Sequence, residues 1–319
     1  MTSLTLAGHA MATRFEFILY GTNEAGIRAA GEEAMEEITR LEAELGFYQS
    51  GSEIYRLNQQ AAEQPVRVSP MLFSLLQRCG ELNQETDGAF DITVAPLMKC
   101  WGLAGGTGRF PDPQEIATAQ DKIGFELLEF DSEESTVRFK KPGVLLDLGS
   151  IGKGFALDLA AEVLIECGIE SALLHGGTST SYAIGHPPEA EVWRVAIVKP
   201  ESGVTLDTAH STPEQEEILA TVELRDNSLS VSAVWGKSFQ HDGKTYGHVI
   251  DPRTGHPVQG ALLSAVVTDR ATNTDALATA LLTLGQSGHA IINKSHSNLK
   301  SLVAIPEESA NYSVISNGI

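Results

Sequence analysis

The chain has 319 residues and a formal net charge of -20, with 42 acidic side chains against 22 basic ones. This balance excludes a nucleic-acid-binding surface, which needs positive charge to neutralise phosphates. A hydrophobic content of 42% excludes a largely disordered chain. No apolar run approaches the roughly 20 residues that a membrane span needs, so we expect no membrane span.

The cysteines and the N-terminal residues bear on the compartment. Cys79, Cys100 and Cys167 are far apart and form no C-x-x-C pair, which favours buried thiols over a metal site or a disulfide framework. The first residues hold no basic region followed by an apolar stretch, and no cysteine that could carry a lipid. We expect a cytoplasmic protein as the sequence is written, or an exported, periplasmic one if a signal segment was removed.

The N-terminal part of the chain predicts a strand and two helices. Residues 14–20 alternate apolar and polar side chains, which is typical of a strand with one face in water. Apolar residues three and four apart between Ile27 and Leu45 predict an amphipathic helix. Ser69-Pro70 supplies a capping hydroxyl and a first-turn proline for a helix that ends near residues 86–88.

The middle of the chain alternates strand and helix signals. Residues 144–147 predict a short buried strand, residues 154–167 a helix that ends at Gly168, and residues 172–175 the next strand. Residues 201–219 are acidic and lack any period, which predicts a surface insertion.

The C-terminal part predicts short strands and one apolar helix. Asp242-Gly243 is a turn signal before a strand over residues 244–250, and residues 263–268 predict a strand that leads into the helix bearing Asp275. No internal repeat or low-complexity linker divides the chain. We therefore expect a single α+β domain over residues 1–319.

Asp275 and Thr279 are four residues apart in that helix, so both oxygens project from one helical face. A carboxylate and a hydroxyl suit a hard cation such as Mg²⁺, which also takes water and phosphate oxygens. The alternative is structural: Asp275 caps the helix and Thr279 bonds back to a carbonyl.

Residues 147–154 place three glycines and Lys153 at a strand-to-helix junction. Glycines there let backbone N–H groups approach an anion, and the helix N-terminus and lysine attract negative charge. The segment fits neither the Walker nor the G-x-G-x-x-G pattern. It predicts a phosphate site, with a tight turn without a ligand as the alternative.

Three further segments each give weaker evidence for a ligand site when taken alone. His248 precedes an Asp-Pro-x-Thr-Gly turn and is suited to act as a general base or a phosphate contact, or as a structural residue. Asp91 is suited to bind ribose or adenine between Phe90 and Trp101, the alternative being a turn and an edge strand. The glycines of residues 175–178 permit close backbone approach to a ligand.

In their order, these segments resemble the ApbE family of FAD:protein FMN transferases. The matching segments are residues 11–13, Tyr48 with 52–58, 88–93, 147–154, 176–177, 248–255 and 274–279. The resemblance spans residues 11–285. It implies an ApbE-type α+β fold with interleaved helices, mostly antiparallel strands and an FAD site in a cleft between sub-domains.

The resemblance also implies a reaction and its residues. The family binds FAD and Mg²⁺, moves FMN onto a Ser or Thr hydroxyl of an acceptor flavoprotein subunit through a phosphoester bond, and releases AMP. Carried over by position, the FAD site comprises Met11, Tyr48, Ala89, Phe90, Asp91, Asp147, Lys153 and His248, and the metal ligands are Ser150, Asp275 and Thr279. Asp275 and His248 are then the catalytic candidates, with His248 as the base that takes the hydroxyl proton.

The chain departs from the family pattern at two places. His175 and Thr178 stand where the family commonly has Asn and an acidic residue or Asn, and residues 230–235 replace a usual Ser-Gly pair. Two alternatives therefore stay open: an FAD pyrophosphatase that yields FMN and AMP, and a catalytically silent FAD-binding protein.

Overall fold

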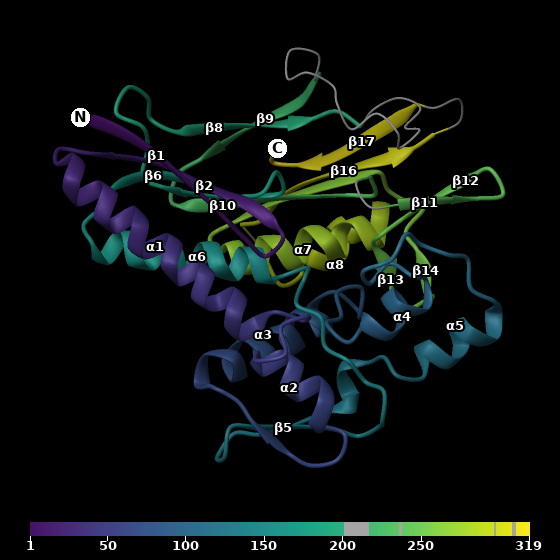
Figure 1. Cartoon of the computed structure of the whole chain (residues 1–319). Helices are drawn as coiled ribbons and strands as arrows, with labels where there is room; N and C mark the ends of the chain where they lie inside the picture. The colour runs from purple at the N-terminus through teal and green to yellow at the C-terminus, as the bar shows by residue number, and fades with distance from the viewer. Residues whose placement is uncertain (201–216, 236–237, 297, 308–310) are drawn as a thin grey trace.

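An eight-stranded sheet organises the molecule (Figure 1). The computed structural model describes residues 1–200, 217–235, 238–296, 298–307 and 311–319. The sheet order is β1-β2-β6-β7-β10-β15-β16-β17, and every neighbouring pair is antiparallel. Its strands are β1 (Thr2–Ala10), β2 (Thr13–Gly21), β6 (Ser171–Gly176), β7 (Thr180–Ile184), β10 (Asn227–Ala233), β15 (Leu263–Thr268), β16 (Lys300–Pro306) and β17 (Tyr312–Asn317).

Helices cover one face of this sheet and a hairpin covers the other. The helices are α1 (Glu24–Leu45), α6 (Gly152–Glu166) and α7 (Ala271–Leu284), and the hairpin is β8 (Trp193–Val198) with β9 (Ile218–Leu224). Strand alternation explains the two faces. Phe17 and Leu174 are buried with the helices, whereas Leu173 and Leu229 are buried with the hairpin.

A smaller part lies beyond the helices, away from the sheet (Figure 1). It contains α2 (Glu53–Gln60), α3 (Pro70–Glu85), α4 (Ala95–Cys100), α5 (Pro113–Gln120), and a three-stranded sheet of β3 (Val66–Arg67), β5 (Thr136–Phe139) and β4 (Leu128–Asp131). Two short hairpins follow, β11 (Ser238–His241) with β12 (Lys244–Gly247) and β13 (Ile250–Asp251) with β14 (His256–Pro257). The helix α8 (Gly288–Ile292) and the 3-10 helices η1 (Phe125–Leu127) and η3 (Gly285–Ser287) complete the elements of the described residues.

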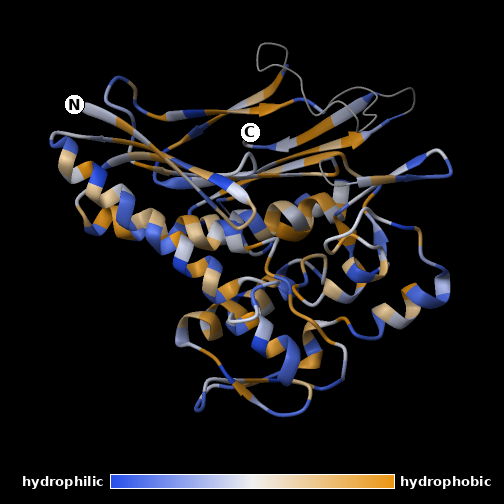
Figure 2. Ribbon diagram, viewed as in Figure 1, coloured by the Kyte–Doolittle hydropathy of each residue, from blue (hydrophilic) through white to orange (hydrophobic). Residues whose placement is uncertain are grey.

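Most elements predicted from the sequence are present. β2 buries Phe15, Phe17 and Leu19 and leaves the alternate side chains partly exposed or exposed. α1 carries hydrophobic and hydrophilic residues along its length (Figure 2) and buries Ile27 through Leu45 at the predicted spacing. In α3 the Ser69 hydroxyl accepts from Leu72 N–H, as expected of the cap. The α+β class with mostly antiparallel strands is confirmed.

Two predicted strands are wrong. Residues 144–147 run without a strand partner because side chains and a loop satisfy their backbone: Asn58 bonds both N–H and C=O of Leu146, at 2.7 and 3.0 Å, and Ile92 C=O accepts from Asp147 N–H. The strand predicted over residues 244–250 breaks at His248, which lies in the bend between β12 and β13.

The predicted acidic insertion falls mostly where no structure is described. Residues 201–216 lie outside the described residues, and Ile218 and Leu219 already belong to β9. Among the helices of the described ranges, none is long and apolar enough to cross a membrane.

Candidate active site

A cavity of about 1840 Å³ opens between the large sheet with its helices and the smaller part. Segments from both parts line it, which matches the expected cleft between sub-domains. The lining includes every residue predicted to bind a cofactor or metal: Met11, Tyr48, Ala89, Phe90, Asp91, Asp147, Ser150, Lys153, His248, Asp275 and Thr279. The fold therefore gathers side chains that are far apart in the sequence.

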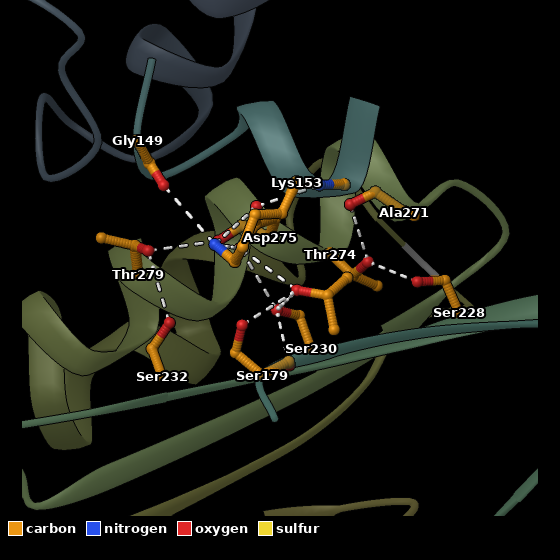
Figure 3. A network of polar contacts seen from close by, with 12 residues as sticks. Gly149, Lys153, Ser179, Ser228, Ser230, Ser232, Ala271, Thr274, Asp275 and Thr279 are labelled. Carbon is orange, nitrogen blue, oxygen red and sulfur yellow. Dashed lines mark hydrogen bonds and ion pairs between the residues drawn. The ribbon is translucent and has the colours of Figure 1, made fainter. Parts of the chain in front are cut away.

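Lys153 and Asp275, which both line this cavity, form an ion pair within a network of polar contacts (Figure 3). Lys153 is the second residue of α6, and its ammonium lies 3.3 Å from each carboxylate oxygen of Asp275. The same ammonium lies 3.5 Å from the carbonyl oxygen of Gly149. Asp275 is only 3% exposed, and the Gly154 N–H donates to its Oδ2 at 3.1 Å. A positive charge is thus held over a buried carboxylate where α6 begins.

Close contact between α6 and α7 brings this pair together. A Cβ on Gly154 would lie 2.0 Å from the carbonyl oxygen of Ala271 and 2.9 Å from Cβ of Asp275. Only glycine permits such an approach, because any side chain would collide with the backbone of α7.

The N-terminus of α7 is capped from α6, and not by Asp275. The buried Asp158 accepts from the N–H groups of Ala271 and Thr272, at 2.8 and 2.9 Å, and from the Thr272 hydroxyl at 2.5 Å. Burial raises the pKa of Asp158, and these bonds act in the opposite direction. Asp275 is the fifth residue of α7, one turn beyond the cap. The capping alternative for Asp275 is wrong, because Asp158 already fills that role.

Thr279 bonds within its helix and also contacts β10. Its hydroxyl donates to the carbonyl of Asp275 at 3.2 Å, as the structural alternative expects, and lies 3.3 Å from Oγ of Ser232. It nevertheless lines the cavity one turn after Asp275.

The donor atoms at this point suit a hard cation. Gly149 C=O and both carboxylate oxygens of Asp275 already surround the cationic ammonium of Lys153, and the half-buried Ser150 follows Gly149 at the cavity wall. Mg²⁺ prefers such all-oxygen surroundings with few carboxylates. In the described ranges no cluster of three or more His, Cys, Asp or Glu side chains is present. The oxygen atoms near this point are those of the Asp275 carboxylate, the Thr279 hydroxyl and the Gly149 carbonyl.

The three glycine N–H groups of the junction that is predicted to bind phosphate have partners within the protein. The N–H of Gly149 donates to Asp147 Oδ1 at 2.8 Å, that of Gly152 to Leu148 C=O at 2.7 Å, and that of Gly154 to Asp275. These amides are engaged within the protein. The glycines instead serve the turn and the close helix contact, and the charge for an anion comes from Lys153.

Asp91 is held by its own turn. Its Oδ1 accepts from Thr93 N–H at 2.7 Å and from the Thr93 hydroxyl at 2.6 Å, and Asn83 donates to Oδ2 at 3.2 Å. Burial raises the pKa of Asp91. No edge strand follows it, since residues 91–94 form a turn.

Trp101 is not a wall of the cavity. It is fully buried in a separate cluster of the smaller part, and its indole N–H donates to Gly255 C=O at 2.8 Å. The predicted role of Trp101 beside the ligand is wrong. The residue instead anchors the turn that follows His248, so its effect on the cavity is indirect.

The remaining cofactor candidates lie at the rim and the entrance. Met11 has a left-handed backbone with φ 51° and donates its N–H to Glu42 at 2.8 Å. Tyr48 is 70% exposed as a residue, but partial burial of its hydroxyl, and after that the nearby Asp147, raise the pKa of this group. An exposed aromatic ring at the entrance is suited to stack on a planar ligand group.

Only part of the segment 175–178 lines the cavity. Gly177 and Thr178 line the cavity, whereas His175 bonds Ser181 at 2.9 Å, and its pKa is lowered by burial. His175 is absent from the cavity lining. The change at His175 therefore does not alter the walls of the cavity.

Several polar residues near Asp275 are not among the site residues predicted from the sequence. Asp158, Thr180 and Ser230 are all buried around α7. Two of them have a signal in the sequence. Asp158 is the only polar residue among residues 155–161, in the helix after Lys153, and Ser230 alternates with Ser228 and Ser232 along one strand.

The fold and the cavity together define an α+β protein with a cleft whose lining includes the Lys153 and Asp275 ion pair. The chain belongs to the ApbE family, whose family model matches residues 11–303.

Named relatives match over most of their length. The chain is 29% identical to the FAD:protein FMN transferase of Haemophilus influenzae, over 89% of this chain and 81% of the relative. It is 31% identical to the FAD:protein FMN transferase of Vibrio cholerae, over 88% and 81%.

Solved structures show the same fold. The apo flavinyl transferase ApbE of Pseudomonas stutzeri superposes with a TM-score of 0.84 at 25% identity, covering 99% of this chain and 95% of that one. The ApbE protein of Thermotoga maritima gives 0.85 at 23% identity, over 99% and 97%. The family and fold predicted from the sequence are confirmed.

Proposed function

We propose that this protein transfers FMN from FAD to a Ser or Thr hydroxyl of a partner flavoprotein subunit and releases AMP, with Mg²⁺ as the cofactor. Its relatives carry the name FAD:protein FMN transferase. The observation that carries the proposal to this chain is the Lys153 and Asp275 pair in the lining of the cavity.

The reaction is a substitution at phosphorus. The acceptor oxygen forms a bond to the FMN-side phosphorus, the bond from that phosphorus to the bridging oxygen breaks, and AMP leaves with the electron pair. The hydroxyl proton must be taken up, and His248 on the cavity wall is our candidate for that base. An imidazole suits this role because it exchanges protons near neutral pH.

Negative charge on the phosphates is the main obstacle to attack by the acceptor oxygen. Lys153 would pair with a phosphate oxygen, which is supported by its place in the cavity lining at the start of α6. Ser150, Asp275 and Thr279 would hold Mg²⁺, which when bound stabilises negative charge on the phosphates. The turn closed by the bond from Gly149 N–H to Asp147 would keep Ser150 in place, whose backbone carbonyl is the candidate ligand.

The walls of the cavity provide for the two ends of FAD. Tyr48 offers an exposed ring at the entrance, and Ala89 and Phe90 offer buried apolar surface further in. Asp91 lies beside Phe90 and supplies a carboxylate for a hydroxyl or amine. This division of polar and apolar lining suits a dinucleotide with two planar rings.

The test is mass spectrometry of an acceptor domain incubated with this protein, FAD and Mg²⁺. We expect one added FMN on a Ser or Thr of the acceptor and an equal amount of AMP. Asp275→Ala should abolish both products. Free FMN without labelled acceptor would instead indicate a pyrophosphatase, and FAD that stays intact would indicate a silent binding protein. Transfer by Asp275→Ala at the parent rate would overturn the metal assignment.

A further inference from the structure

A row of hydroxyl groups on β10 faces the helix that carries Asp275 (Figure 3). Ser228, Ser230 and Ser232 occupy alternate positions of the strand, so their side chains point to one side. Ser228 lies 2.7 Å from the hydroxyl of Thr274, and Ser232 lies 3.3 Å from that of Thr279. The row therefore follows α7 past the predicted metal ligands.

Ser230, the middle member, reaches Asp275 together with Thr180 of β7. Their hydroxyl oxygens lie 3.5 and 3.4 Å from Oδ1 of Asp275, and 3.1 Å from each other. Both side chains are buried, with 0% and 1% exposure. Water is thus kept from this side of the carboxylate.

Lys153 lies 3.3 Å from both carboxylate oxygens of Asp275, and the other protein partners of the two oxygens differ. Oδ2 accepts from the Gly154 N–H, and Oδ1 faces the two hydroxyls. A buried carboxylate needs donors on both oxygens, because an unpaired one carries a large desolvation cost. Donors on both oxygens fix the plane of the carboxylate as well as its position.

The hydroxyl groups can also rotate and donate to a different acceptor. Ser230 is 3.2 Å from the carbonyl of Ser179 as well as close to Asp275 and Thr180. Each hydroxyl has one proton and rotates to suit its neighbours. The pair can therefore keep Asp275 oriented while the charge next to that carboxylate changes.

We propose that Thr180, Ser230 and Ser232 are positioning residues that orient Asp275 and Thr279 toward the divalent cation. This inference rests on the metal assignment within the proposed function. Carboxylates that bind metals are usually held by such outer hydrogen bonds, whose loss typically weakens metal affinity about 10- to 100-fold.

Ser230→Ala and Ser228→Ala form a matched pair of variants. Both serines are fully buried on the same face of the same strand, and each loses a buried hydroxyl, but only Ser230 contacts Asp275. A purely structural role predicts the same effect for both. We expect Ser230→Ala to weaken Mn²⁺ binding about 10-fold, and Ser228→Ala to bind Mn²⁺ like the parent.

The measurement is a titration with Mn²⁺ followed by electron paramagnetic resonance, with the full chain and FAD but no acceptor. Equal Mn²⁺ affinity in the two variants would overturn the inference, as would a parent that binds no Mn²⁺. Thermal unfolding of both variants checks that they are folded.

Two variants of Thr180 give a second, independent test of the inference. Thr180→Val removes the hydroxyl and keeps the shape, whereas Thr180→Ser restores the hydroxyl. We expect weakened Mn²⁺ binding in the first and recovery in the second; loss in both would contradict orientation by the hydroxyl. If the parent binds Mn²⁺ with these dependences yet labels no acceptor, the proposed transfer fails while the positioning role stands.

Discussion

Lys153 and Asp275 are 122 residues apart in the chain, yet their charged groups lie 3.3 Å apart in the cavity. At the scale of single residues, the charge of Lys153 is the main attraction that this cavity offers to a phosphate. Its side chain is 22% exposed, so water screens it only in part.

Lys153→Met should weaken FAD binding about 10-fold or more, because a charge-assisted bond to phosphate contributes roughly 1.5 to 3 kcal/mol. Fluorescence titration with FAD measures this. Lys199→Met is the matched control: Lys199 also lines the cavity, but it pairs with Glu217 at 2.6 Å near the surface. An equal loss of affinity in both variants would mean that only the overall charge of the cavity matters.

Asp147 should link stability to pH. Burial raises its pKa in the folded state, against the bond from Gly149 N–H. A raised carboxyl pKa means that the folded state prefers the protonated form, so this stability is present below the unfolded pKa and is lost as pH rises through the folded pKa. The side chain of the Asp147→Asn variant does not ionise, so the variant does not lose this stability as pH rises. We expect a higher melting temperature than the parent at pH 7, with the difference shrinking toward pH 4, and weaker FAD binding.

Thermal unfolding of the parent and the Asp147→Asn variant between pH 4 and 8 tests this. Asp112→Asn is a control for charge removal alone, because Asp112 is an exposed cap of α5. A lower melting temperature of Asp147→Asn at pH 7 would show that the ionised carboxylate stabilises its turn after all.

At the scale of elements, the contact of α6 with α7 decides the geometry of the site. Gly154→Ala should destabilise the protein by roughly 1 to 3 kcal/mol or more, since its Cβ would lie 2.0 Å from Ala271 C=O and the helices must separate. Separation moves Lys153 away from Asp275, so Mn²⁺ and FAD binding should fall as well.

Gly152→Ala is the matched control in the same helix. Its Cβ would meet no heavy atom within 4 Å, so we expect unchanged or slightly higher stability, by about 0.4 to 1 kcal/mol at most. Urea unfolding measures both variants. Similar behaviour of the two would contradict the idea that close helix packing is what Gly154 provides.

Some elements around the site could be predicted from the sequence, and others could not. Periodicity identifies α1 and β2 because burial of one face is a local pattern. The loop at Leu146 and the buried cap from Asp158 depend on partners distant in the chain, Asn58 and Ala271. Local spacing carries no information about such partners. The lining residues were predicted through the family resemblance, which adds what spacing lacks.

At the scale of the whole molecule, one hydrophobic core runs through both parts. The same cluster of buried residues contains Phe17 of the large sheet, Leu277 of α7 and Leu72 of α3. The cavity is bounded by both parts as well, with Ala89 on one side and Asp275 on the other. A ligand in the cavity therefore contacts both parts and should stabilise them together.

Calorimetry with and without FAD tests this expectation of a single unit over residues 1–319. A ligand that binds only the folded state adds about 2.7 kcal/mol at a concentration 100 times its Kd, which for a chain of this size raises Tm by roughly 5 °C. We expect one transition that moves as a whole. If Lys153→Met binds FAD 10-fold more weakly, the same FAD concentration adds only about 1.4 kcal/mol, so its shift should be about half that of the parent. Two transitions, of which FAD moves only one, would mean that the smaller part unfolds independently and that the ligand is bound by one side of the cavity alone.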